Sequence, residues 1–298
     1  FTGLYDSSHG LVDNGQRLAP ELTTLAESLA AEGYHTAGFF GGPYLHDTFG
    51  LGDGFEVWQS CMTAIPDDLG DAEMRDESRA RKRLSHRDVT GPRTLEEVTR
   101  WADTRPKDRP FFLFVHLWDV HYDFIPPPPY DRLFDPDYRG SISGAGFMEN
   151  PAVNRKMDPR DLAHLVARYD GEIRFTDAIL GKILDVLRAH GMQDDTLTVI
   201  TADHGEAFFE HGSKGHHKTL FDELVRVPLV MHWPGQLPAG HVVRAPVGLI
   251  DLAPTILALL DLPTEGLAGQ DLGPVLRDES RAPAHVFVFA DDEFERVR

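Results

Sequence analysis

Cysteine, long apolar runs and basic side chains are all scarce in this sequence. The single cysteine, Cys61, cannot form an intrachain disulfide, which excludes a small disulfide-stabilised scaffold and leaves the redox compartment open. No apolar run approaches the roughly 20 residues that cross a bilayer, and no signal peptide pattern is present. Only 29 basic side chains stand against 48 acidic ones, for a net charge of −19. This balance excludes a protein whose main task is to grip nucleic-acid phosphates or anionic lipid.

The residues that are present predict a globular α/β protein. The chain has 298 residues, of which 41% are hydrophobic, and this length suits one large domain or two ordinary ones. Apolar periodicity and turn signals place the expected helices at 20–31, 94–103, 159–189 and 251–260, and the expected strands at 34–40, 110–115, 196–201, 226–233 and 286–290. Continuous apolar runs such as 110–115 are typical of strands buried on both faces. Strands that alternate with helices predict a mixed, mostly parallel sheet.

Polar side chains gather directly after two of the expected strands. His116, Asp119 and His121 follow the strand at 110–115, and Asp203 and His204 follow the strand at 196–201. Open α/β sheets bind their ligands beyond the carboxyl ends of the strands. A carboxylate oxygen and an imidazole nitrogen are ordinary metal ligands, so the Asp-His pair predicts part of a metal site.

Six segments carry a resemblance to a known family. They are FTGLYDSSHG at 1–10, TLAESLAAEGYHTAGF at 24–39, FLFVHLWDVHYDFIPPPP at 112–129, YDGEIRFTDAILGKIL at 169–184, TADHGE at 201–206 and GHHKTLFDELVRVPLV at 215–230. Together, and in this order, they resemble the sulfatases of the alkaline phosphatase superfamily. The resemblance implies an alkaline-phosphatase-like α/β sandwich, with a mostly parallel mixed central sheet flanked by helices. It implies one domain over residues 1–298, with insertions or irregular loops at 60–93 and 130–158.

The same resemblance implies a metal-dependent hydrolysis of sulfate esters. In the family, two metal-binding acids and a C/S-x-P-x-R nucleophile motif, whose residue becomes formylglycine, would precede Phe1 of this chain. Cys61 does not replace that nucleophile, because Cys61-Met62-Thr63-Ala64-Ile65 lacks the proline and arginine of the motif. We therefore expect a fragment, truncated at both ends, that is inactive without its upstream nucleophile.

Residue by residue, the resemblance assigns roles to five positions. Asp203 and His204 match the second half of the family's metal site, and His121 matches a histidine that contacts the sulfate and the leaving-group side. At the leaving group we favour His216, with Lys218 as the second choice. The resemblance favours Ca²⁺ as the single divalent ion, whereas an Asp-His donor pair leans towards Mn²⁺ or Zn²⁺, and both alternatives stay open.

Two other functions remain open at the level of sequence. The first is a phosphodiester or phosphonate-ester hydrolase, or a phosphoethanolamine transferase, of the same superfamily, since phosphate and sulfate share tetrahedral geometry. The second is a non-catalytic sulfatase-like binding module. The expected partner is a small-molecule or glycan sulfate ester, with no nucleic acid and no membrane segment. The substrate, the oligomeric state and the cellular compartment are not determined by the sequence.

Overall fold

The computed structural model describes residues 1–298 except 12–15, 65–84, 217–218, 279, 282 and 284–298. Its α-helices are α1 (Asp6–His9), α2 (Leu25–Ala31), α5 (Gly91–Thr104), α6 (Pro159–Ala189), α7 (Asp222–Val225), α8 (Leu252–Leu259) and α9 (Gly273–Arg277). Its strands are β1 (His35–Phe40), β2 (Val57–Ser60), β3 (Phe111–His116), β4 (Thr198–Thr201), β5 (Ala207–Phe208), β6 (Lys214–Gly215) and β7 (Leu229–His232). Short 3₁₀ turns lie at Pro43–Leu45, Asp47–Phe49, Tyr130–Arg132 and Leu249–Asp251. The strand expected at 286–290 lies outside the described residues.

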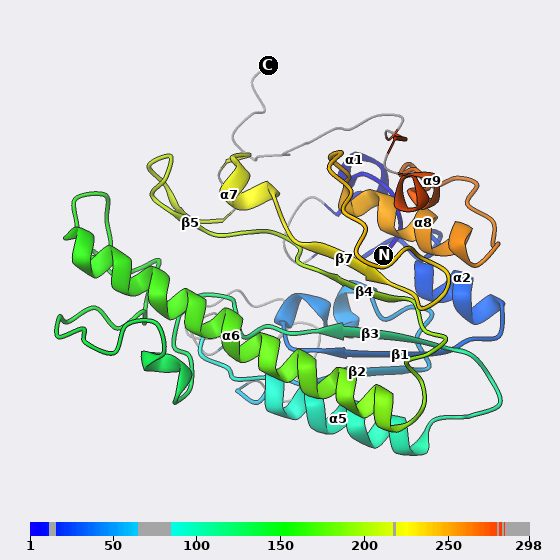
Figure 1. The fold of residues 1–298 in the computed structure, drawn as a ribbon, viewed down its shortest axis with the longest axis horizontal. Coiled ribbons are helices and arrows are strands. Elements are labelled where there is room, and N and C mark those ends of the chain that lie inside the picture. The colour runs from blue at the N-terminus through cyan, green and yellow to red at the C-terminus, as the bar shows by residue number, and fades with distance from the viewer. Residues whose placement is uncertain (12–15, 65–84, 217–218, 279, 282, 284–298) are drawn as a thin grey trace.

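A parallel sheet forms the centre of the fold. Its order is β2-β1-β3, and Gly38 of β1 is in register with Trp58 on one side and Phe114 on the other. β4 pairs with β7 in an antiparallel ladder, with Thr201 opposite Leu229. Figure 1 shows these strands stacked in one layer, with β7 and β4 above β3, β1 and β2. The expected mixed α/β fold is confirmed.

β3 and β4 are less buried than the expectation of strands buried on both faces implies, although both faces of β3 are covered. All six residues of β3 are half-buried, and Thr201 of β4 is exposed. The reason lies in strand pairing: within the described ranges, β3 pairs only with β1, and β4 pairs only with β7. One edge of each strand therefore has no ladder.

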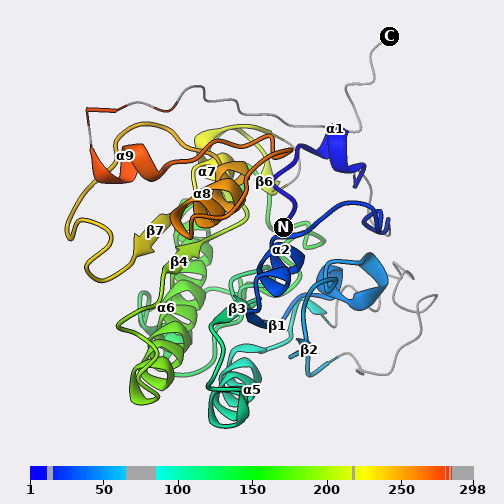
Figure 2. The ribbon, with the colours of Figure 1, turned by 90° about the vertical axis from the view of Figure 1, so that its right-hand side faces the viewer.

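Two helices cover one face of the parallel sheet. Figures 1 and 2 both show α5 and α6 side by side along it. Val98 and Trp101 of α5 and Ile179 and Ile183 of α6 pack against Phe39 of β1 in the largest buried cluster. Cys61 is fully buried in the same cluster, as expected for an ordinary small apolar residue. This core fixes the strands whose ends carry the site.

The opposite face of the sheet is filled by aromatic rings. The ring of Trp58 lies 5.9 Å from that of Phe114 and 4.6 Å from that of Phe55, measured between centroids. Gly38 leaves the space for this stack, because a Cβ at that position would lie 2.2 Å from the Trp58 ring. The packing of the Trp58 ring therefore requires a glycine at position 38.

α2 begins later than its apolar pattern predicts. The expected helix spans 20–31, but the helix begins at Leu25, because Thr24 is its N-cap. The Thr24 side chain accepts a hydrogen bond from the Glu27 backbone, and the Glu27 carboxylate accepts one from the Thr24 backbone. This reciprocal capping box defines the helix start.

Among the helices of the described ranges, none is long and apolar enough to span a membrane.

Candidate active site

The loops that follow β3 and β4 meet and carry the expected site residues. After β4, His204 Nε2 lies 3.7 Å from Asp203 Oδ2. The Nδ1–H of His204 donates to the Gly205 carbonyl at 2.8 Å, which leaves the Nε2 lone pair facing the carboxylate. A backbone acceptor on one ring nitrogen commonly fixes the tautomer of a metal-binding histidine.

His216 lies directly beside this pair. Its ring centroid is 4.1 Å from that of His204, and its Nδ1 lies 3.2 Å from Glu206 Oε2. Both side chains of the His216–Glu206 contact are buried, with 3% and 4% exposure. The contact therefore fixes the orientation of the His216 ring.

His121 approaches from the loop after β3. Its ring lies 5.2 Å from that of His216 and stacks on Trp118 at 4.0 Å with an angle of 14°. Its Nδ1–H donates to the Tyr122 carbonyl at 2.6 Å. The structure thus brings together Asp203, His204, His216 and His121, while Lys218 lies outside the described residues.

Burial keeps the inner imidazoles neutral. Burial, followed by the charge of neighbouring histidines, lowers the pKa of His121 to about 2 and that of His216 to about 3. Burial also raises the pKa of Glu206 to about 8. Because burial disfavours the charged form of every group, the His216–Glu206 contact is that of two neutral side chains.

The donors present fit about half of a metal site. Asp203 supplies a carboxylate that is 75% exposed, and His204 supplies a fixed nitrogen. His116, at the end of β3, has a buried Nδ1 with no hydrogen-bond partner among the described atoms, and burial lowers its pKa against the opposing charge of Asp203. Within the described part of the chain, no group of three or more His, Cys, Asp or Glu side chains could hold an ion. Further ligands would have to come from elsewhere.

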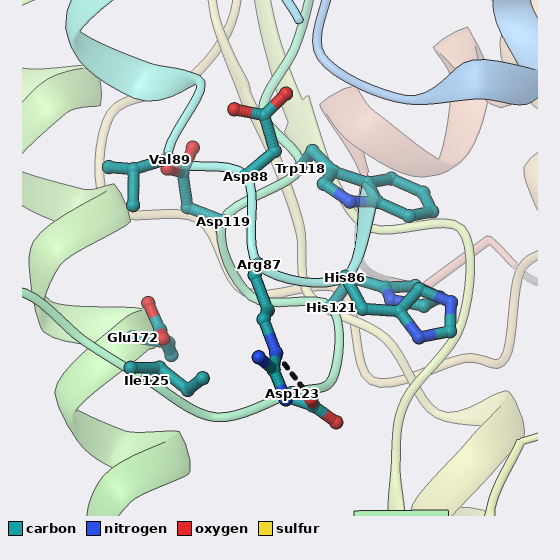
Figure 3. A pocket seen from close by; sticks show the side chains of 10 residues that line it. All are labelled: His86, Arg87, Asp88, Val89, Trp118, Asp119, His121, Asp123, Ile125 and Glu172. Atoms are coloured by element: carbon teal, nitrogen blue, oxygen red, sulfur yellow. Dashed lines mark ion pairs between the residues drawn. The ribbon is translucent and has the colours of Figure 1, made fainter. Parts of the chain in front are cut away.

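A segment of the expected insertion at 60–93 completes the wall of the site. Residues 85–90 belong to this charged insertion and bring His86 beside His121, with ring centroids 5.0 Å apart. Figure 3 shows both rings on one side of a small pocket, with Asp119 and Glu172 on another side. His86 was missed because a histidine in a charged stretch without periodicity carries no sequence signal. Trp118 lay within a quoted motif, but its stacking partner was not visible from sequence.

Glu172 is an interior acid of α6 that faces the same pocket. Burial, followed by the charge of Asp119, raises the pKa of its carboxyl to about 8, against the opposing effects of a backbone hydrogen bond from Ile125 and of the Arg168 charge. A raised folded-state pKa means that the folded protein binds more protons than the unfolded chain between pH 4.5 and pH 8. Stability is therefore lost across this window as pH rises.

We expect Glu172→Gln to raise the melting temperature at pH 8 by several degrees and to change it little near pH 4.5, where the carboxyl is protonated in the folded protein and half protonated in the unfolded chain. Melting curves at both pH values check this. Glu21→Gln, at an exposed position, is the matched control and should show no such difference. An equal effect of Glu172→Gln at both pH values would contradict the titration argument.

The fold and the site define an α/β protein that gathers carboxylate and imidazole groups at the ends of its strands. The family model for sulfatases matches residues 1–262, and the chain belongs to the sulfatase family. The expected family is confirmed. The chain spans about half the length of the sulfatase relatives that it matches along most of its own length.

A sulfatase relative agrees with this assignment, and solved structures share the fold. The chain is 25% identical to an ulvan-active sulfatase of Formosa agariphila, over 93% of this chain and 54% of that protein. BT4656, solved with its substrate D-glucosamine-2-N,6-O-disulfate, has a TM-score of 0.71 at 18% identity, covering 95% of this chain and 70% of that one. A phosphonate monoester hydrolase of Agrobacterium radiobacter has the same TM-score at 24% identity, covering 95% and 67%. At these identities the solved structures show the fold alone.

Proposed function

We propose that this chain is the core of a metal-dependent sulfatase that hydrolyses sulfate esters. The observation that carries the proposal is the row formed by His204, His216 and His121 beside Asp203, on a chain of the sulfatase family. Carboxylate and imidazole groups at one edge of a sheet suit a tetrahedral anion and its metal.

Asp203 and His204 would hold the metal ion in this proposal. Such an ion stabilises negative charge on the transferred group and lowers the pKa of the nucleophile. The Nδ1–H bond from His204 to the Gly205 carbonyl keeps Nε2 available as a ligand. We favour Ca²⁺ from family membership, and Mn²⁺ or Zn²⁺ is the alternative that the Asp-His donor pair supports.

His121 and His216 would contact the substrate. In the proposed reaction, a nucleophile hydroxyl would lose its proton as its oxygen bonds to sulfur, while the bond between sulfur and the leaving oxygen breaks and the leaving oxygen takes up a proton. His216, fixed by Glu206, is placed to contact the leaving oxygen, and His121, fixed by Trp118 and Tyr122, to contact the sulfuryl group. Lys218 is the second choice at the leaving oxygen.

We further propose that a formylglycine nucleophile and two more metal carboxylates complete the site, because the described residues supply only part of its ligands. On this proposal the chain by itself shows no turnover above background and binds metal weakly. The substrate class that we favour is a sulfated glycan, because the ulvan-active relative and the disulfate-bound BT4656 are named for such molecules.

Comparison of two substrates tests the proposal in a protein extended by the family's two metal-binding acids and C/S-x-P-x-R motif, called the longer protein below. With the same nitrophenol leaving group, kcat/KM should be at least about tenfold higher for the sulfate than for a phosphonate monoester. The 298-residue chain assayed in parallel is the control. A preference for the phosphonate would favour the phosphonate-ester hydrolase, and absence of both activities would favour a non-catalytic module.

A further inference from the structure

The loop that carries His121 is held at its base by a buried carboxylate. Asp119 is 6% exposed and accepts hydrogen bonds from Thr90 Oγ1 at 3.1 Å and from the Gly91 amide at 3.2 Å. Two residues later, the His121 amide donates to the Trp118 carbonyl at 2.9 Å, which closes a tight turn around Asp119. A displacement of Asp119 therefore moves His121 as well.

Glu172 of α6 faces the same loop from the helix layer. Its side chain belongs to a residue that is 4% exposed, and it lines one small pocket together with Asp119 and His121 (Figure 3). Its carboxyl accepts a hydrogen bond from the Ile125 amide, just after the loop. The acid on α6 is therefore bonded to the chain next to the loop and shares a pocket with the loop's own acid.

The surroundings of Glu172 offer little compensation for a second negative charge. The pocket has a volume of about 10 Å³, room for about one water molecule. Of the nearby cations, Arg87 pairs with Asp123 at 3.6 Å, and Arg168 donates to the Phe124 carbonyl at 2.9 Å. Two buried carboxylates that face each other with so little hydration disfavour the ionisation of the second. The titratable and charged groups around Glu172 are Asp119, His121, Asp123, His86, Arg87, Asp88 and Arg168.

We propose that Glu172 is a positioning residue for His121, and that its proton allows the loop at 118–123 to pack against α6. Loss of the proton sets a second negative charge opposite Asp119 and displaces the loop, and His121 then leaves its place beside His216. The inference rests on the proposed function, in which His121 contacts the sulfuryl group.

The change falls just above neutral pH and has a definite sign. Burial, followed by the charge of Asp119, raises the pKa of Glu172 to about 8, so the carboxyl is protonated at neutral pH and ionises as the pH rises further. His121 does not titrate in this range, because its own pKa is about 2. The position of His121, and with it turnover, is therefore lost on the alkaline side.

The first test follows the His121 ring by NMR in the 298-residue chain and needs no turnover. The ring C–H signal, assigned by its loss in His121→Gln, should shift with a midpoint near pH 8. Glu172→Gln, which is neutral at every pH, should abolish this step. Asp119→Asn should move the midpoint to lower pH, because the charge of Asp119 raises the pKa of Glu172. Glu206→Gln removes the other buried acid with a pKa of about 8, and as the matched control it should leave the step in place.

The second test measures kcat/KM for a sulfate ester in the longer protein. Between about pH 7 and about pH 9 it should fall about tenfold, because one unit above its pKa only about a tenth of Glu172 keeps its proton. Glu172→Gln should reduce this loss at least about threefold. Asp177→Asn, on the exposed side of α6, should not change it.

Three outcomes overturn the inference. One is the absence of any step in the His121 signal, and another is a step that persists in Glu172→Gln. Asp119→Asn decides this point if Glu172→Gln does not fold, and an unmoved midpoint then counts against Glu172. The third is a step in the signal with no matching change in kcat/KM. If the step depends on Glu172 but the longer protein hydrolyses no sulfate ester, the proposed function fails, and Glu172 positions a histidine that has no part in that reaction.

Discussion

Replacing Asp203 by asparagine or His204 by alanine is expected to lower kcat for sulfate esters on the order of 10³-fold in the longer protein. A metal that stabilises developing charge acts mostly on the transition state. Loss of one of its ligands therefore weakens the stabilisation of the transition state and lowers kcat. Steady-state kinetics with an aryl sulfate measure the loss, and metal content measured on the same samples reports its cause.

Two matched controls separate this effect from general damage to the fold. Asp194→Asn removes an exposed carboxylate shortly before β4, and His190→Ala removes an imidazole at the end of α6. Both should retain full turnover and full metal content. If Asp203→Asn and His204→Ala also retained both, the metal-site proposal would be wrong.

Replacing His216 by alanine should give a loss that depends on the leaving group. A poor alkoxide leaving group needs a hydrogen bond or a proton at its oxygen, and it should lose about 10²-fold or more in kcat. A nitrophenol leaves readily without help and should lose much less. A series of sulfate esters with leaving groups of increasing pKa measures this as a steeper dependence of log kcat in the variant.

The control for His216 is its buried partner. Glu206→Gln keeps the shape and a hydrogen-bonding group next to His216 Nδ1, so it should show a weaker dependence on the leaving group than His216→Ala. Equal losses of His216→Ala on all esters would remove His216 from the leaving oxygen. Lys218→Ala would then be the next variant to examine.

The parts of the fold that depend on local pattern could be predicted from the sequence. α6 was expected at 159–189 and is observed at Pro159–Ala189, since Asp158 caps its start by accepting from the Arg160 amide and Gly191 follows its end with φ of 68°. The polar residues after β3 and β4 could also be assigned to one site, because the ends of neighbouring strands lie at one edge.

The parts that depend on long-range packing could not be predicted. His86 is held beside His121 by hydrogen bonds between residues more than 30 positions apart in the sequence, such as the bond from Trp118 to Ser85. Glu172 lies on a helix whose pattern gives no sign that this one acid faces an interior pocket. The half-buried state of β3 likewise depends on which strand lies beside it, which a short apolar run does not encode.

The edges of β3 and β4 that lack a ladder within the described residues bear on how separate copies of the chain behave in solution. Exposed strand edges offer free N–H and C=O groups to any other extended segment, and they are common starting points for aggregation. The net charge of −19 opposes such contacts, because two copies repel each other at a distance. Salt shortens the range of that repulsion to about 8 Å at physiological ionic strength. Solubility of the chain therefore depends on its acidic surface, and dilute buffers should keep it dispersed better than concentrated salt.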